Sequence, residues 1–169
     1  MPPPRTLLNL AAFQAVWFAC VLFAAAGRPW LGVAALGVSL VAQYRSTRAA
    51  KLLGTAALLG LAGEWALHAA AVTGYPPQAW TGEPAPAWMV ALWVNFASTL
   101  QSSLKWLQGR YVFATVLGAI GGPLSYWGGE QLGAITLNPD QGVWFCGVGI
   151  LWALSTPLLV WIAEETEEA

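Results

Sequence analysis

The sequence predicts an all-α, polytopic membrane protein: a bundle of six transmembrane helices with its N- and C-termini in the cytoplasm. Three observations support this fold class. The 169-residue chain is 57% hydrophobic and only 9% charged, whereas soluble domains carry roughly 25% charged residues. Its apolar residues fall into six runs, most of them close to the roughly 20 residues that cross a bilayer as a helix. Finally, the basic residues collect on one side of the predicted topology.

The six predicted helices belong to one domain over residues 1–163, followed by an acidic cytoplasmic tail over 164–169. They cover residues 7–26, 30–43, 50–73, 87–107, 111–127 and 143–163. The second is short, since its 14 residues rise only about 21 Å as a helix. We still expect it to cross, because six crossings put almost every basic residue on the inner side. The inner set is Arg5, Arg45, Arg48, Lys51, Lys105 and Arg110, and Arg28 alone is outer.

Composition also limits the partners. A formal net charge of −1 gives no basic surplus to neutralise phosphates, so nucleic-acid binding is not expected. Cys20 and Cys146 lie inside apolar runs, which predicts neither a disulfide scaffold nor a metal site. We expect no cofactor. The expected partners are membrane lipids, a small hydrophobic ligand or another membrane protein.

The strongest functional signal lies in the third run. Glu64 and His68 are four residues apart, so on a helix they lie one turn apart on the same face. An ionisable side chain within a bilayer usually faces the bundle interior or a cavity and indicates function. We therefore predict Glu64 and His68 as catalytic residues. A purely structural pair, in which each satisfies the other, is the competing interpretation.

Further residues are predicted to form a polar and aromatic pocket in the outer half of the membrane, around Glu64. Some of these residues are assigned to the pocket by their depth along the predicted helices. Others are assigned to it because a buried N–H or hydroxyl needs a hydrogen-bond partner. The predicted substrate-binding residues are Gln14, Trp65, Trp93, Asn95, Ser125 and Tyr126. Asn95 falls level with Glu64, and Pro123 is expected to kink the helix just before Ser125. Simple interior packing is the alternative for the tryptophans.

Two outer features complete the prediction. The loop 74–86 contains four prolines, which stiffen it; we interpret it as a connector, or alternatively as a lid over the pocket. Trp88 lies at a predicted outer boundary, where tryptophan anchors a helix at the membrane interface.

Several short motifs together resemble an uncharacterised family of small bacterial inner-membrane proteins, catalogued only as a domain of unknown function. The matching residues are Asn9, Phe13-Gln14, Trp17-Phe18, Glu64, Pro86-Ala87-Trp88, Ala91-Leu92-Trp93, Thr99-Leu100, Ser103-Leu104, Trp106-Leu107, Gly122-Pro123-Leu124-Ser125-Tyr126 and Leu132-Gly133-Ala134. The resemblance implies a bacterial inner membrane and a gene neighbourhood that often includes fatty-acid-modifying enzymes. It implies no established activity.

Three functions remain open from the sequence. The first is an enzyme that modifies a lipid or fatty acid, with Glu64 as acid or base. No Gly-x-Ser-x-Gly or His-Glu-x-x-His signature supports a standard hydrolase or metalloenzyme. The second is a capture or transport protein that binds a small molecule from the outer side. The third is a non-catalytic membrane accessory protein.

Overall fold

The structure is a computed structural model that describes residues 4–43, 49–79 and 85–168. Within these ranges it contains six α-helices, which confirms the all-α prediction. They are α1 (Pro4–Ala25), α2 (Pro29–Gln43), α3 (Ala49–Ala69), α4 (Ala87–Ala97), α5 (Tyr111–Gln131) and α6 (Gln141–Glu168), with a 3-10 turn η1 (Lys105–Leu107) and two short strands, β1 (Thr73–Gly74) and β2 (Thr136–Leu137). Residues 80–84 of the proline-containing loop and the side chains of Arg5, Arg45 and Arg48 lie outside the described part.

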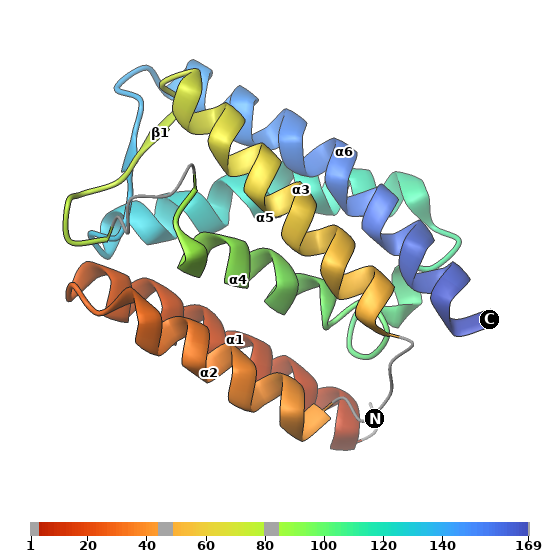
Figure 1. Ribbon diagram of the computed structural model, residues 1–169. Helices are drawn as coiled ribbons and strands as arrows, with labels where there is room; N and C mark the ends of the chain where they lie inside the picture. Colours follow the sequence, from red (N-terminus) through yellow and green to blue (C-terminus); the bar gives the residue numbers. More distant parts are fainter. Residues whose placement is uncertain (1–3, 44–48, 80–84, 169) are drawn as a thin grey trace.

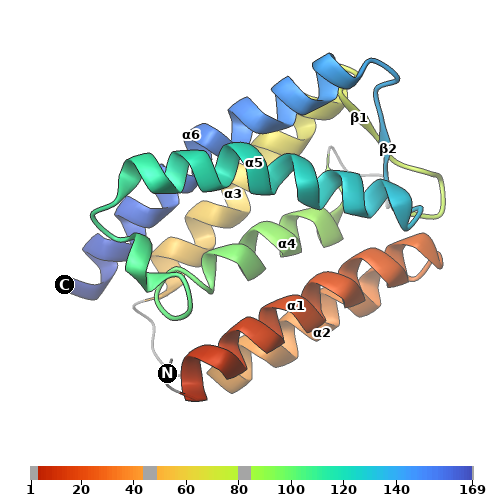
Figure 2. The same ribbon diagram turned by 180° about the vertical axis from the view of Figure 1, so that it is seen from behind.

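The short helix α4 lies at the centre of the bundle. It packs against α1 and α2 on one side and against α3 on the other. The helix α6 packs against both α3 and α5 (Figure 1). Seen from behind, α1 and α5 lie nearest the viewer, with α4 between them and farther back (Figure 2). The central position of α4 explains why its side chains are buried on more than one face, including Trp88, Trp93 and Asn95.

Three of the helices are long and apolar enough to cross a membrane. These stretches are Thr6–Ala25 in α1, Ala49–Ala69 in α3 and Gln141–Glu167 in α6. The helix α5 passes without interruption through Pro123. The start of α1 and the end of α6 lie at the same end of the bundle (Figure 1).

The prediction of a helix over residues 87–107 is wrong in its length, because α4 ends at Ala97. Hydroxyl side chains explain the early end: Ser98 Oγ donates to the Asn95 carbonyl at 2.6 Å and Thr99 Oγ1 to the Phe96 carbonyl at 2.6 Å. Such local bonds compete with the helical backbone pattern. Asn9 of α1 then holds the following turn, since its Oδ1 accepts a 2.6 Å bond from the Ser103 hydroxyl.

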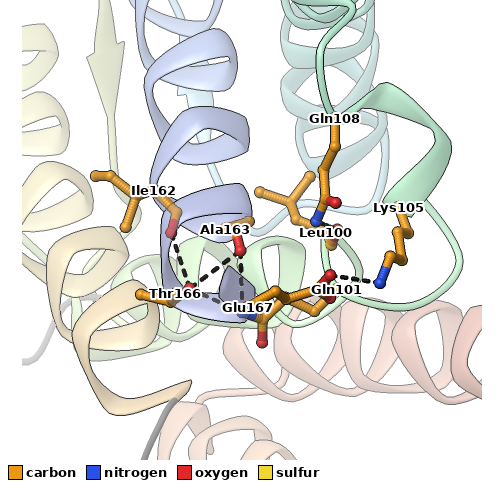
Figure 3. A network of polar contacts seen from close by, with 8 residues as sticks. All are labelled: Leu100, Gln101, Lys105, Gln108, Ile162, Ala163, Thr166 and Glu167. Carbon is orange, nitrogen blue, oxygen red and sulfur yellow. Dashed lines mark hydrogen bonds and ion pairs between the residues drawn. The ribbon is translucent and has the colours of Figure 1, made fainter. Parts of the chain in front are cut away.

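The turn after α4 is fastened to the last turns of α6 (Figure 3). Gln101 Nε2 donates to Thr166 Oγ1 at 2.8 Å and to the Ala163 carbonyl at 3.3 Å, and Lys105 forms an ion pair with Glu167. The predicted acidic tail is therefore not a separate extension here: its residues continue α6 as far as Glu168.

At the opposite end, the antiparallel pair β1–β2 ties the loop after α3 to the loop after α5. Gly74 is required there, because a Cβ at this position would lie 2.6 Å from Thr136 Oγ1. Trp88 fixes the residues beyond β1 by donating from Nε1 to the Ala79 carbonyl at 2.9 Å. Trp88 is thus a buried residue that positions this loop, not the interface anchor that the sequence predicted.

Candidate functional site

The candidate site is built around Glu64, whose side chain is fully buried on the inner face of α3. Gly60, one turn earlier on that face, lets a neighbouring helix approach closely. A Cβ added at Gly60 would lie 2.7 Å from Cγ of Trp93. The absence of that Cβ allows the Trp93 indole to lie directly against α3 and reach the carboxylate.

Three aromatic side chains donate hydrogen bonds to Glu64. Trp93 Nε1 of α4 donates to Oε1 at 2.8 Å, and the Tyr75 hydroxyl of the loop after β1 donates to Oε2 at 2.7 Å. The Tyr126 hydroxyl of α5 donates to the same oxygen, Oε1. Both carboxylate oxygens of Glu64 therefore act as acceptors. One acid therefore links α3, α4, α5 and the β1 loop.

Tyr75 lies outside the helices, directly after β1. Burial, and after it the charge of Glu64, raises the pKa of the Tyr75 phenol above its ordinary value. The hydroxyl therefore keeps its proton and stays a donor to Glu64. Its ring also contacts Trp88 edge-on, with centroids 6.3 Å apart.

A cavity of about 440 Å³ lies beside this cluster, between α1, α4, α5 and α6. Its volume is within the range of about 300–1,000 Å³ typical of ligand pockets. Exposed apolar residues on both sides, Leu10 of α1 and Leu117 and Leu124 of α5, mark an opening between these two helices. In Figure 2, α1 and α5 lie toward the viewer, with α4 behind them. The described residues that line the cavity carry no charged side chain.

The cavity and the carboxylate share a wall. Trp93 and Tyr126 line the cavity and donate to Glu64 behind them, but Glu64 itself is not part of the lining. Trp152 of α6 stacks on Trp93, with ring centroids 4.2 Å apart and planes inclined by 24°. Glu64 thus fixes the orientation of two of the aromatic rings that shape the cavity.

Polar atoms are few in the cavity wall. Trp17 Nε1 of α1 donates to Ser125 Oγ of α5 at 2.8 Å, which spans the two sides of the opening. Deeper in the wall, Thr156 Oγ1 is buried without a hydrogen bond among the described residues. The Trp152 indole N–H lies near the Tyr126 hydroxyl but makes no bond of standard geometry.

Four of the predicted site residues gather around Glu64 or the cavity. Trp93 and Tyr126 contact the acid directly, and Gln14 and Ser125 line the cavity. The cavity beside these residues is lined from α1, α4, α5 and α6. Their predicted role in substrate binding stays a prediction.

Three other predicted site residues lie elsewhere. Asn95 donates to the Phe13 carbonyl at 2.9 Å and thereby joins α4 to α1, away from Glu64. Trp65 is 56% exposed on the outer face of α3. His68 is also exposed; its Nδ1 lies 3.2 Å from the Thr73 carbonyl, and its ring centroid is 5.9 Å from that of Tyr75. Tyr75 contacts both His68 and Glu64.

Two residues of the site were missed from the sequence. Tyr75 lies in a proline-rich loop with no periodicity to orient it, so nothing indicated that its hydroxyl reaches α3. Trp152 of α6 was not among the predicted site residues. The usable signal was the glycine spacing of α5: a Cβ at Gly122 would lie 2.5 Å from Cγ of Trp152, so glycine at this position admits the indole.

The described residues contain no group of three or more His, Cys, Asp or Glu side chains that could hold a metal ion. The fold and the site together define a class: a small, helical, membrane-type protein with a carboxylate buried beside an apolar interhelical cavity. The chain belongs to the family described as protein of unknown function (DUF2878), whose match covers residues 6–158. This confirms the resemblance to a family of unknown function. No curated protein and no solved structure matches the chain.

Proposed function

We propose that this protein binds an apolar, membrane-dissolved molecule in the cavity between α1 and α5. The observation that carries the proposal is the position of the cavity opening. Leu10, Leu117 and Leu124 are exposed apolar residues around it, and an opening edged by such residues admits a molecule from the hydrocarbon region of a bilayer more readily than one from water.

The role of Glu64 in this proposal is positional. Its two oxygens accept three hydrogen bonds, and the side chain has no exposure to the cavity or to solvent. A group so enclosed holds Trp93 and Tyr126 in fixed orientations, which preserves the shape of the cavity for its ligand.

A lipid-modifying enzyme is the second candidate, and one observation favours it. The Tyr126 hydroxyl lines the cavity and is bonded to Glu64, so a proton could pass between a bound molecule and the acid through this phenol. His68 lies outside such a path, beyond Tyr75. If the protein is an enzyme, Glu64→Gln should block the reaction. The molecule recovered with this variant would then differ chemically from that recovered with the wild type.

The proposed location is the bacterial inner membrane, with several crossings and both termini cytoplasmic. The three long apolar helices support membrane insertion, and the excess of basic residues on the predicted inner side supports the orientation.

The binding proposal is tested by filling the cavity. Gly121 lines it, and a Cβ at this position would meet no atom within 4 Å. Gly121→Phe should therefore occupy the cavity without a backbone clash. We expect mass spectrometry of the full-length protein, extracted in polymer-bounded native membrane discs, to show one class of apolar molecule enriched on the wild type and lost from this variant.

The matched control is Gly54→Phe on α3, where an added Cβ also meets no atom within 4 Å but no cavity is present. It should retain the molecule. Identical lipid profiles for the wild type and Gly121→Phe would contradict the proposal, because the cavity would then be irrelevant to what the protein carries.

A further inference from the structure

Gln14 is the most unusual residue at the cavity opening. It is an exposed amide on α1 with no hydrogen bond among the residues that the structure describes, and it lines the cavity. The apolar stretch of α1 runs from Thr6 to Ala25, so Gln14 lies about 2 Å along the axis from its middle. An unpaired amide at this depth is costly.

Ser125, on the opposite side of the opening, has a free donor. Its Oγ accepts the bond from Trp17, and no acceptor for the Ser125 hydroxyl proton occurs in the described part of the chain. Gln14 lies three residues before Trp17, on the same side of α1. The amide and the hydroxyl therefore flank one opening, and both can bond to a third group placed there.

The cavity wall also restricts the charge of that group. No Lys, Arg or His lines the cavity among the described residues, and Glu64 lies behind Trp93 and Tyr126. A carboxylate or phosphate would therefore find no cation to pair with. Glutamine and serine suit a neutral oxygen, since an amide both donates and accepts.

We propose that the ligand is a neutral lipid with one hydroxyl or carbonyl group, which bonds to Gln14 and Ser125 at the opening between α1 and α5 while its apolar part fills the aromatic cavity. This inference rests on the proposed binding function and adds the chemical class of the ligand. Thr156 Oγ1, buried in the same wall without a hydrogen-bond partner in the described part of the chain, is a polar position in the interior beyond the opening.

The test measures quenching of tryptophan fluorescence in full-length protein held in phospholipid nanodiscs. Three test compounds share one dibrominated octadecyl chain and differ at its end: the alcohol, the alkane and the carboxylate. They are compared at equal mole fraction in the bilayer. Quenching that Gly121→Phe abolishes is counted as binding in the cavity, because bromine also quenches lipid-facing tryptophans outside it.

For the wild type we expect half-maximal cavity quenching by the alcohol at a mole fraction about 3- to 10-fold lower than by the alkane, as one or two hydrogen bonds would give. The carboxylate should be weaker than the alcohol. Gln14→Leu, which removes a polar group from an apolar surface and should not disturb folding, should reduce the preference for the alcohol to the level of the alkane. Gln131→Leu, at the end of α5 and away from the cavity lining, should leave the preference unchanged.

The outcomes separate the two proposals. Equal quenching by alcohol and alkane, or an alcohol preference that survives Gln14→Leu, overturns the polar contact while cavity binding stands. Tightest binding by the carboxylate overturns the neutrality of the ligand. If Gly121→Phe changes quenching by none of the three compounds, the proposed function itself fails.

Discussion

Two of the polar networks that join helices in the described part of the chain differ in their access to water. The first, called the inner network because it is buried in the bundle, has Glu64 at its centre, bonded to Tyr75, Trp93 and Tyr126. The second, called the outer network because it is partly exposed, joins the turn after α4 to the end of α6 through Gln101, Thr166 and the Lys105–Glu167 ion pair (Figure 3). In the outer pair, 56% of the Lys105 side chain and 26% of the Glu167 side chain are exposed.

The difference shows where charge controls this fold. A buried acid has no water to replace a lost donor, so each of its bonds affects stability strongly. An exposed ion pair exchanges its partner for water at little cost. The inner network should therefore determine the shape of the cavity, and the outer network should only restrain the end of the bundle.

The largest effect is expected from Glu64→Leu. The substitution keeps an apolar side chain of similar size but leaves the donors of Tyr75, Trp93 and Tyr126 without their common acceptor. We expect the free energy of unfolding to fall by about 3–5 kcal/mol. It is measured by denaturant titration in detergent micelles, monitored through helical circular dichroism.

Glu64→Gln is the conservative control for this prediction. It retains one acceptor oxygen but replaces the other with an amide that cannot accept, so about 1–3 kcal/mol should be lost. Should Glu64→Leu prove as stable as the wild type, the donors would be satisfied without the acid, and the inner network would not control the fold.

A smaller effect is expected from Trp93→Phe. Phenylalanine preserves an aromatic ring against Trp152 but removes the N–H that bonds Glu64 at 2.8 Å. Loss of this bond leaves a buried acceptor with one donor fewer and should cost about 1–3 kcal/mol. The same denaturant titration measures it.

Trp161→Phe provides the matched control on α6, since this tryptophan is largely exposed. It should change the unfolding free energy by less than about 0.5 kcal/mol. Equal losses from the two variants would mean that the ring of Trp93, and not its hydrogen bond, stabilises the bundle.

The sequence predicted the centre of the inner network well. An acid in the middle of an apolar run has few places to go but the interior, and Trp93 and Tyr126 were chosen from the depth of their helices. It did not predict Tyr75, because a loop residue has no period that fixes its direction. The same reasoning misplaced His68: one turn beyond Glu64, near the end of α3, that face is no longer covered by another helix.

The end of α4 depends on side chains that the predicted helix passed over. The stretch after Ala97 reads Ser98-Thr99-Leu100-Gln101-Ser102-Ser103, and the helix ends where Ser98 and Thr99 bond to carbonyls one turn earlier and the distant Asn9 bonds to Ser103. Asn95 was directed to the wrong partner for a related reason, since its acceptor is a backbone carbonyl of α1. Contacts of this kind depend on helix packing that residue spacing does not specify.

The smallest effect is expected in the outer network, from Lys105→Gln and Glu167→Gln. Each variant removes one charge of an exposed ion pair, so each should lower the unfolding free energy by less than about 1 kcal/mol. Added salt screens such a pair but not the buried Glu64 cluster. Salt should therefore reduce the difference in unfolding free energy between wild type and Lys105→Gln, while leaving the effect of Glu64→Leu unchanged.

The double variant gives the coupling energy between the two charges, which should lie near that of other exposed pairs, about 0.2–1 kcal/mol. A coupling as large as the effect of Trp93→Phe would mean that the end of α6 is as firmly held as the cavity wall, and the contrast between the two networks would not hold.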